Sequence, residues 1–206
     1  MIQDYNYGRI IEYLSERDEI LSEIIIKIGA CTLSSNNYYF SSLTRIIINQ
    51  QLSIKAGNAI YNRLIKSTER LSPHSVMSLH EEDFRKIGIS RKKQLYLKNL
   101  SELFISDEID FNIFFKLTDE EILKKLQEIK GIGKWSAEMF MIFSLNRLDI
   151  LPLTDSGFLR SFQINYNYKK DNLQENILKH GNKWRPYRSI AVWYLWQSIN
   201  EKKVVF

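Results

Sequence analysis

Residues 126–143 read LQEIKGIGKWSAEMFMIF, and this stretch decides the fold of the chain. Apolar residues recur at helical spacing on both sides of Gly131-Ile132-Gly133, which predicts two helices joined by a short hairpin. Glycines let a backbone turn sharply and come close to another chain, and the amides that begin the second helix then favour an anion such as a DNA phosphate. An ordinary helix–helix turn with a glycine cap would give the same letters, because Gly-X-Gly alone is a weak signal.

Helical periodicity continues through most of the remaining sequence. Ser41-Ser42 and Ser53 are candidate helix caps, and Thr118 with Glu121 forms a capping box. With only eight Gly and three Pro, the chain does not suit a turn-rich all-β fold, so the expected class is all-α. The expected helices cover residues 8–16, 18–29, 43–49, 54–65, 80–87, 91–104, 119–127, 134–146, 156–162 and 187–200, with a loop in the Asn-rich stretch around residue 166.

Charge is distributed unevenly along the 206 residues, a length that suits one large domain or two small lobes sharing a core. Residues 134–206 carry eleven Lys and Arg against six Asp and Glu, which accounts for the whole net charge of +5. An excess gathered in one part of a chain suggests a surface that faces a polyanion. A charge that only keeps the protein in solution would fit the composition equally well.

The single cysteine, Cys31, excludes several kinds of site. One thiol forms no intrachain disulfide, no four-cysteine iron–sulfur cluster and no cysteine-type zinc site, so we expect a buried, inert side chain. The first ten residues, MIQDYNYGRI, contain no signal-peptide core, and no apolar run reaches the roughly 20 residues of a membrane span. We therefore expect a soluble intracellular protein, in the cytoplasm or nucleoid of a prokaryote.

A carboxylate stands in the sequence Leu151-Pro-Leu-Thr-Asp155, 22 residues after Gly133. That distance leaves room for one helix and a return, so Asp155 can lie near the helix that follows the hairpin. A carboxylate there could stabilise positive charge that develops on a sugar ring, or orient a water molecule. Asp155 also stands where a helix N-cap belongs, and the two roles are compatible.

All four tryptophans follow residue 134, in the part of the chain that carries the positive charge. Electron-rich ring faces attract flat cationic groups and stack on unpaired bases. For any one tryptophan, packing in the core is the default interpretation.

The sequence INQQLS, residues 48–53, interrupts two apolar helices with polar side chains. A side chain that projects from such a turn could fill the gap left by a base extruded from a duplex. The alternative is an ordinary interhelix turn held by amide hydrogen bonds.

Taken together, these segments resemble the 3-methyladenine DNA glycosylase II family of the helix-hairpin-helix (HhH-GPD) DNA glycosylase superfamily, from about residue 40 to residue 200. The resembling segments are IIINQQLSIKAGNAI (46–60), GISRKKQLYLKNL (88–100), LQEIKGIGKWSAEMF (126–140), LPLTDSGFLRSF (151–162) and WRPYRSIAVWYLW (184–196). The resemblance implies an all-α, two-lobed fold over residues 1–206 with the active site in the cleft between the lobes. The hairpin falls at about 119–146 and the catalytic segment at about 150–162, and the N-terminal β-containing domain of longer members is absent.

The implied function is base excision repair by a monomeric enzyme whose partner is double-stranded DNA containing damaged bases, with no membrane partner. The enzyme would flip out an alkylated purine of the 3-methyladenine type, with 7-methylguanine as a second substrate, and hydrolyse its N-glycosidic bond to leave an abasic site. Asp155 falls on the catalytic aspartate. The implied base pocket comprises Trp135, Met139, Trp193 and Trp196. The implied DNA contacts are Gln50, Gln51, Leu52, Ser53, Gly131, Gly133 and Lys134, with Gln51 the first candidate wedge and Leu52 the second.

Bifunctional relatives place a nucleophilic lysine two residues after the second glycine of the hairpin. Trp135 occupies that place here and Lys134 is one residue early, so base removal without strand cleavage is expected. Met139 and Ser156 stand where the family often has aromatic residues, which leaves the range of substrates open.

No cofactor is required by the resemblance, and Na⁺ or K⁺ is a candidate ligand of backbone carbonyls at the hairpin. The candidate carbonyls are those of Gln127, Ile129 and Ile132. Other functions remain open: a glycosylase of the same fold that acts on oxidised or mismatched bases, a non-catalytic helix-hairpin-helix DNA-binding module, and a structural helical protein.

Overall fold

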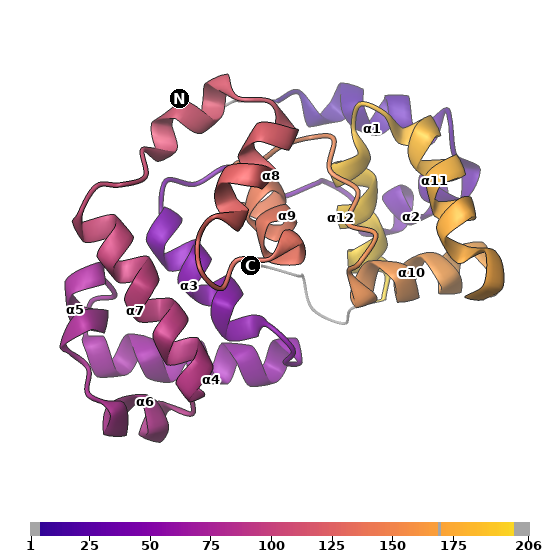
Figure 1. Cartoon of the computed structure of the whole chain (residues 1–206). Helices are drawn as coiled ribbons and strands as arrows, with labels where there is room; N and C mark the ends of the chain where they lie inside the picture. Colours follow the sequence, from indigo (N-terminus) through magenta and orange to yellow (C-terminus); the bar gives the residue numbers. More distant parts are fainter. Residues whose placement is uncertain (1–4, 169, 200–206) are drawn as a thin grey trace. The chain divides into compact units, whose positions relative to one another are not determined.

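The computed structural model describes residues 5–168 and 170–199, and every regular element in these residues is a helix (Figure 1). The all-α prediction is confirmed. In chain order, the elements are α1 Tyr7–Ser15, α2 Glu19–Ile28, α3 Tyr39–Asn49, α4 Ile54–Thr68, α5 Pro73–Ser78, α6 Glu81–Ile87, α7 Arg91–Ile105, the 3-10 helix η1 Phe111–Lys116, α8 Asp119–Gln127, α9 Lys134–Phe143, α10 Ser156–Tyr166, the 3-10 helix η2 Lys170–Asn172, α11 Leu173–Trp184 and α12 Arg188–Ser198. Within the described residues, no helix combines the length and the apolar content that a membrane crossing needs.

The chain divides into two compact units. The terminal unit comprises the residues up to Asn36 and those from Met141 onward, and the central unit comprises Asn37–Phe140. In the terminal unit, α12 is buried on every side over residues 189–197 and packs against α2 and α10. A helix that is buried all round is the core of its unit.

The central unit is built around α3 and α7, which pack against each other. α3 also contacts α4, and α7 also contacts α5 and α6. The sides of α3 and α7 that face the core carry Leu43, Ile46, Leu97 and Leu100, all of them buried. This apolar packing fixes the backbone of the unit, from which the turn at residues 50–53 and the hairpin at residues 128–133 emerge.

Local capping confirms three of the expected helix starts. Ser53 accepts a hydrogen bond from the amide of Ala56 at 3.3 Å, and Thr118 and Glu121 form the predicted capping box. Asp155 caps α10 through the amide of Phe158 at 2.6 Å.

Other predicted bounds were wrong. Ser41-Ser42 does not cap α3, which begins at Tyr39, because the Ser41 hydroxyl donates to the carbonyl of Tyr38 instead of accepting from an amide. α9 ends at Phe143, before the predicted Asn146, since Asn146 adopts the left-handed conformation with φ 53°. α10 runs on to Tyr166 into the stretch expected to be a loop. The predicted end of the last helix, Asn200, lies outside the described residues.

The sequence did not predict α5, η1 or α11. Cys31 is half-buried rather than fully buried, and burial raises the pKa of its thiol to about 11. The side chain is therefore a neutral thiol at physiological pH, as expected for an inert cysteine.

One buried carboxylate joins three helices of the terminal unit. Asp18 caps α2 through the amide of Leu21, and its Oδ2 accepts hydrogen bonds from the Tyr166 hydroxyl and the Trp184 indole, each at 2.8 Å. Nδ1 of His180 lies 3.0 Å from the same oxygen. Burial raises the pKa of Asp18, but the hydrogen bonds from His180, Leu21, Trp184 and Tyr166 together outweigh it, so the pKa lies below its ordinary value of 3.8.

Asp18→Asn should therefore lower the free energy of unfolding by about 2 kcal/mol or more at pH 7, because buried donors lose a charged acceptor. A carboxylate whose pKa is lowered by folding contributes stability above its unfolded pKa, and that stability is lost as the pH falls through the folded pKa. The variant should accordingly lose part of the acid dependence that the wild type shows below about pH 4. Urea unfolding over a pH series measures both effects, with Asp171→Asn at an exposed carboxylate as the control. Equal stability of the Asp18 variant and the wild type at pH 7 would contradict this role.

Candidate functional site

The carboxylate of Asp155 is held in place by two donors from different helices. Asp155 is 7% exposed, and its Oδ1 accepts hydrogen bonds from the Phe158 amide at 2.6 Å and from Nε1 of Trp196 at 2.8 Å. Its position at the N-terminus of α10 also favours a negative charge. The structure therefore confirms the capping role and fixes the direction of the carboxyl group.

Trp196 lies about two turns after Ser189, near the end of the buried run of α12, which covers residues 189–197. Its ring is stacked on Phe143, with centroids 5.4 Å apart and planes at 26°, and its indole nitrogen donates to Asp155. Beside them, a Cβ at Gly157 would lie 3.2 Å from Oδ1 of Asp155 and 3.5 Å from Nε1 of Trp196. A larger residue at position 157 would therefore crowd the hydrogen bond between the indole and the carboxylate.

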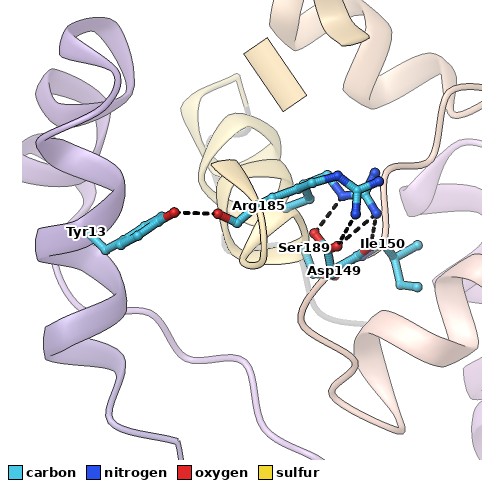
Figure 2. A network of polar contacts seen from close by, with 6 residues as sticks. Tyr13, Asp149, Ile150, Arg185 and Ser189 are labelled. Atoms are coloured by element: carbon cyan, nitrogen blue, oxygen red, sulfur yellow. Dashed lines mark hydrogen bonds and ion pairs between the residues drawn. The ribbon is translucent and has the colours of Figure 1, made fainter. Parts of the chain in front are cut away.

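The loop that leads to Asp155 is joined to the start of α12 by a polar network (Figure 2). Arg188 donates from Nε to Oδ1 of Asp149 at 2.6 Å, and its second donor, Nη2, reaches both Oδ2 and the backbone carbonyl of that residue. Arg185 adds a hydrogen bond to Oδ2 of Asp149 at 2.9 Å, and the Ser189 hydroxyl accepts from the Ile150 amide at 2.9 Å. A bidentate guanidinium–carboxylate pair is both strong and directional.

The segment from residue 149 to residue 155 is thus held by α12 at both of its ends. Arg188 and Ser189 hold the first end, and Trp196, seven residues farther along the same helix, holds the second. At about 1.5 Å per residue, these two points lie roughly 10 Å apart on a rigid helix. Asp149 and Arg188 were not predicted from the sequence. The one local signal was that Asp149 is a charged residue directly before the apolar residues 150–153, which indicates that it needs a partner.

At the hairpin, the two glycines meet different constraints. Gly131 has φ 96°, and a Cβ there would run into the ring of Tyr96. At Gly133 a Cβ would meet no atom within 4 Å, and φ lies outside the left-handed region. The carbonyl of Gly133 accepts the first hydrogen bond of α9, from Ala137 at 3.0 Å. The fold therefore requires a glycine at position 131 but not at position 133.

The turn at residues 50–53 presents its side chains to solvent from a fixed backbone. Gln51, Leu52 and Ser53 are exposed, as a DNA-contacting turn requires. Gln50 behaves differently, because its Nε2 donates to the carbonyl of Gly131 at 2.8 Å and to Oγ of Ser136 at 2.9 Å. Gln50 therefore links the turn to the hairpin, and DNA contact by its side chain stays a prediction.

The four residues expected to form a base pocket differ in accessibility. Met139, Trp193 and Trp196 are 0%, 1% and 4% exposed, and Trp135 is half-buried. Trp193 lies edge-on against Tyr194, at 4.9 Å between centroids, as core side chains do. The burial of Met139, Trp193 and Trp196 means that none of them offers an open face to a base in this structure, so their role in a pocket stays a prediction.

The carbonyls proposed for a monovalent cation lie in the hairpin segment. That of Ile129 accepts a hydrogen bond from the Ile132 amide at 2.9 Å, and a carbonyl oxygen has a second lone pair for a cation. These groups fit a weakly held monovalent ion, which stays a prediction. In the described part of the chain, no three His, Cys, Asp or Glu side chains gather as ligands of a metal ion. Lys134 is exposed, with Nζ 3.9 Å from Oε1 of Glu138.

Comparison with known proteins relates the chain to DNA repair enzymes. The sequence profile of the HhH-GPD superfamily, described as base excision DNA repair protein, matches residues 44–186. The alkylbase DNA glycosidase-like protein mag2 of Schizosaccharomyces pombe is 31% identical over 204 residues, which cover 96% of each chain. DNA-3-methyladenine glycosylase 1 of the same yeast is 34% identical over 163 residues, which cover 77% of this chain and 72% of the relative.

A solved structure shares the fold over almost the whole chain. The 3-methyladenine DNA glycosylase Mag1 of Schizosaccharomyces pombe, in complex with abasic DNA, superposes with a TM-score of 0.84 at 31% sequence identity. The match covers 96% of this chain and 100% of that chain.

The contrast between the two glycines gives a paired test. Gly131→Ala should lower the free energy of unfolding by more than about 1 kcal/mol, because the left-handed conformation disfavours a Cβ and the methyl group meets Tyr96. Gly133→Ala should leave stability unchanged or raise it by up to about 1 kcal/mol, yet weaken binding to duplex DNA, since the methyl group stands where a phosphate would approach the amides. Urea unfolding and fluorescence anisotropy measure the two effects. Unchanged DNA affinity in Gly133→Ala would contradict phosphate binding at the hairpin.

Proposed function

Because this chain belongs to the HhH-GPD superfamily of base excision DNA repair proteins, we propose that it is a monofunctional DNA glycosylase for alkylated purines. Its substrates are bases of the 3-methyladenine type, and 7-methylguanine by the same chemistry, in double-stranded DNA. The product is an abasic site. One observation carries the proposal. Asp155 lies in the segment that follows the hairpin, and its buried carboxylate accepts a hydrogen bond from Trp196.

The chemistry of the substrate suits a site with one carboxylate. An N-alkylated purine carries a formal positive charge, so the base leaves as a neutral molecule and needs little acid catalysis. The bond between C1′ and the base nitrogen breaks with both electrons passing to the base, and the sugar becomes oxocarbenium-like. The negative charge of Asp155 stabilises this cation and helps to align the water whose oxygen bonds to C1′, while the proton of that water leaves toward the carboxylate.

Preorganisation of Asp155 adds to its effect. A carboxylate that is already held by the Phe158 amide and the Trp196 indole does not have to reorient when charge develops on the sugar. The hydrogen bonds that Asp155 accepts from Phe158 and Trp196 stabilise the fold, and its negative charge can still act on the sugar. This explains why one residue serves both as a helix cap and as the catalytic group.

DNA is held mainly through its phosphates, independently of sequence. The hairpin offers the amides at the start of α9, and Gly133 leaves space for the close approach of an anion. The exposed ammonium of Lys134 adds positive charge at the same place. Exposed Gln51 and Leu52 are the candidates to enter the duplex where the base is extruded.

The direct test of the function is incubation of the protein with methylated DNA and identification of the released bases by mass. Asp155→Asn should lower base release by at least about a hundredfold and leave DNA binding intact. The amide oxygen of asparagine can still accept from Phe158 and Trp196, so the variant should fold, with a lower melting temperature because both hydrogen bonds lose a charged acceptor. Asp171→Asn removes the same charge at an exposed position and serves as the control. Near-normal excision by Asp155→Asn would refute the catalytic assignment.

The second test concerns strand cleavage. Trp135 stands where strand-cleaving relatives have a lysine, so the product should be an intact strand with an abasic site. Borohydride reduces and traps the Schiff base that a lysine nucleophile forms with the sugar. We expect no covalent protein–DNA adduct on a denaturing gel. An adduct that disappears in Lys134→Met would show instead that Lys134 takes over the role of the missing lysine.

A further inference from the structure

The turn that carries Gln51 is held from behind by the ammonium group of a lysine in another helix. Nζ of Lys93, in α7, donates to the backbone carbonyl of Ile48 at 2.7 Å and to that of Gln50 at 2.8 Å. Both carbonyls belong to the last turn of α3 and the residue that follows it. Carbonyls at a helix C-terminus lack partners within the helix, and a cation is favoured there.

The second of these hydrogen bonds acts directly on the conformation of Gln51. The carbonyl of Gln50 belongs to the peptide plane that joins Gln50 to Gln51, so fixing this carbonyl restricts the rotation about φ of Gln51. That φ is 58°, in the left-handed region, which is unfavourable for a residue other than glycine. Such a conformation persists only where the surroundings hold it, and Lys93 supplies that restraint.

A second set of contacts connects the turn to the hairpin within the central unit. The side chain of Gln50 donates to the carbonyl of Gly131 and to Oγ of Ser136. Tyr96, one turn after Lys93 on α7, packs its ring against Gly131. The same helix therefore contacts both the turn and the hairpin, which fixes the distance between Gln51 and the hairpin amides.

We propose that Lys93 is a positioning residue that presets the turn at residues 50–53, so that Gln51 enters the duplex at a fixed distance from the phosphate held by the hairpin. This inference rests on the proposed function. Lys93 acts on the protein backbone and does not bind DNA, because two of its three donors are committed to carbonyls. Its half-buried position agrees with this, and desolvation lowers the pKa of the ammonium group.

The test compares Lys93→Met with Lys98→Met, which removes the same charge from the same helix away from the turn. Each protein is assayed for release of 7-methylguanine from a full duplex and from a single-nucleotide bulge, where the base is already unpaired. Lys93→Met should lower kcat/KM on the duplex at least about tenfold and on the bulge by much less, because extrusion from a bulge costs less. Lys98→Met should behave like the wild type on both.

Two further readouts separate positioning from phosphate binding and from a general loss of structure. The log–log dependence of duplex affinity on salt should keep its slope in Lys93→Met, whereas the loss of a phosphate contact would reduce it by about 0.9. In a double-mutant cycle with Gln51→Ala, the Lys93→Met change should cost little once the Gln51 side chain is absent. If Lys93→Met does not fold, Lys93→Arg replaces it, and should lose part of the duplex activity while melting near the wild type.

Parallel losses on duplex and bulge, a reduced salt slope, or additive effects in the cycle would each overturn the positioning role. Wild-type levels of duplex activity in Lys93→Met would do so as well. These outcomes differ from a failure of the proposed function, in which the wild-type protein would release no alkylated base from either substrate.

Discussion

A buried carboxylate cannot remain unpaired, and in this protein that constraint organises the site around Asp155. The residue is almost enclosed, and the indole of Trp196 and the amide of Phe158 supply the donors that it needs. Leaving a buried charge without partners would cost several kcal/mol, so α12 and the start of α10 must stay together for the fold to be stable. The same contacts that stabilise the terminal unit therefore give Asp155 one direction.

The network of Asp149, Arg188 and Ser189 also fixes the loop that precedes Asp155. It attaches the loop to α12 two turns before Trp196, so a rigid helix sets both ends of the segment that ends in Asp155. A catalytic group on a loop gains precision when a helix fixes the loop in this way. The direction of the Asp155 carboxyl group then depends on how α12 packs in the terminal unit.

In the central unit, hydrogen bonds from buried or half-buried side chains hold the backbone of an exposed turn, residues 50–53. Its DNA-facing candidates must be exposed, and exposed turns are mobile unless their backbone is held. Lys93 and Gln50 hold the turn through carbonyl groups, and Tyr96 packs against Gly131 of the hairpin. The side chains of Gln51 and Leu52 remain exposed on a backbone that is fixed from the interior. Gly133 adds an open approach to the helix amides, and the fold itself does not require a glycine there.

The sequence by itself determined the features that depend on neighbouring residues: the helical class, the hairpin around Gly131, the capping box at Thr118 and the cap at Asp155. Periodicity and capping act within a few residues, so a single sequence displays them. The resemblance to the glycosylase family adds that Trp135 stands where strand-cleaving relatives have a lysine. The predicted start of α3 was wrong because a serine hydroxyl can donate to a preceding carbonyl, as Ser41 does to Tyr38, instead of accepting from a following amide.

Only the tertiary structure decided which distant residues support the site. The bonds from Trp196 to Asp155, from Arg188 to Asp149 and from Lys93 to Ile48 join positions 41, 39 and 45 residues apart, and no local pattern encodes such pairs. A cation four residues before the buried Leu97, on the same side of α7, was a signal that Lys93 has a partner inside the protein. Which partner it has was decided by the packing of α7 against α3, because only that packing brings the ammonium group to the end of the helix.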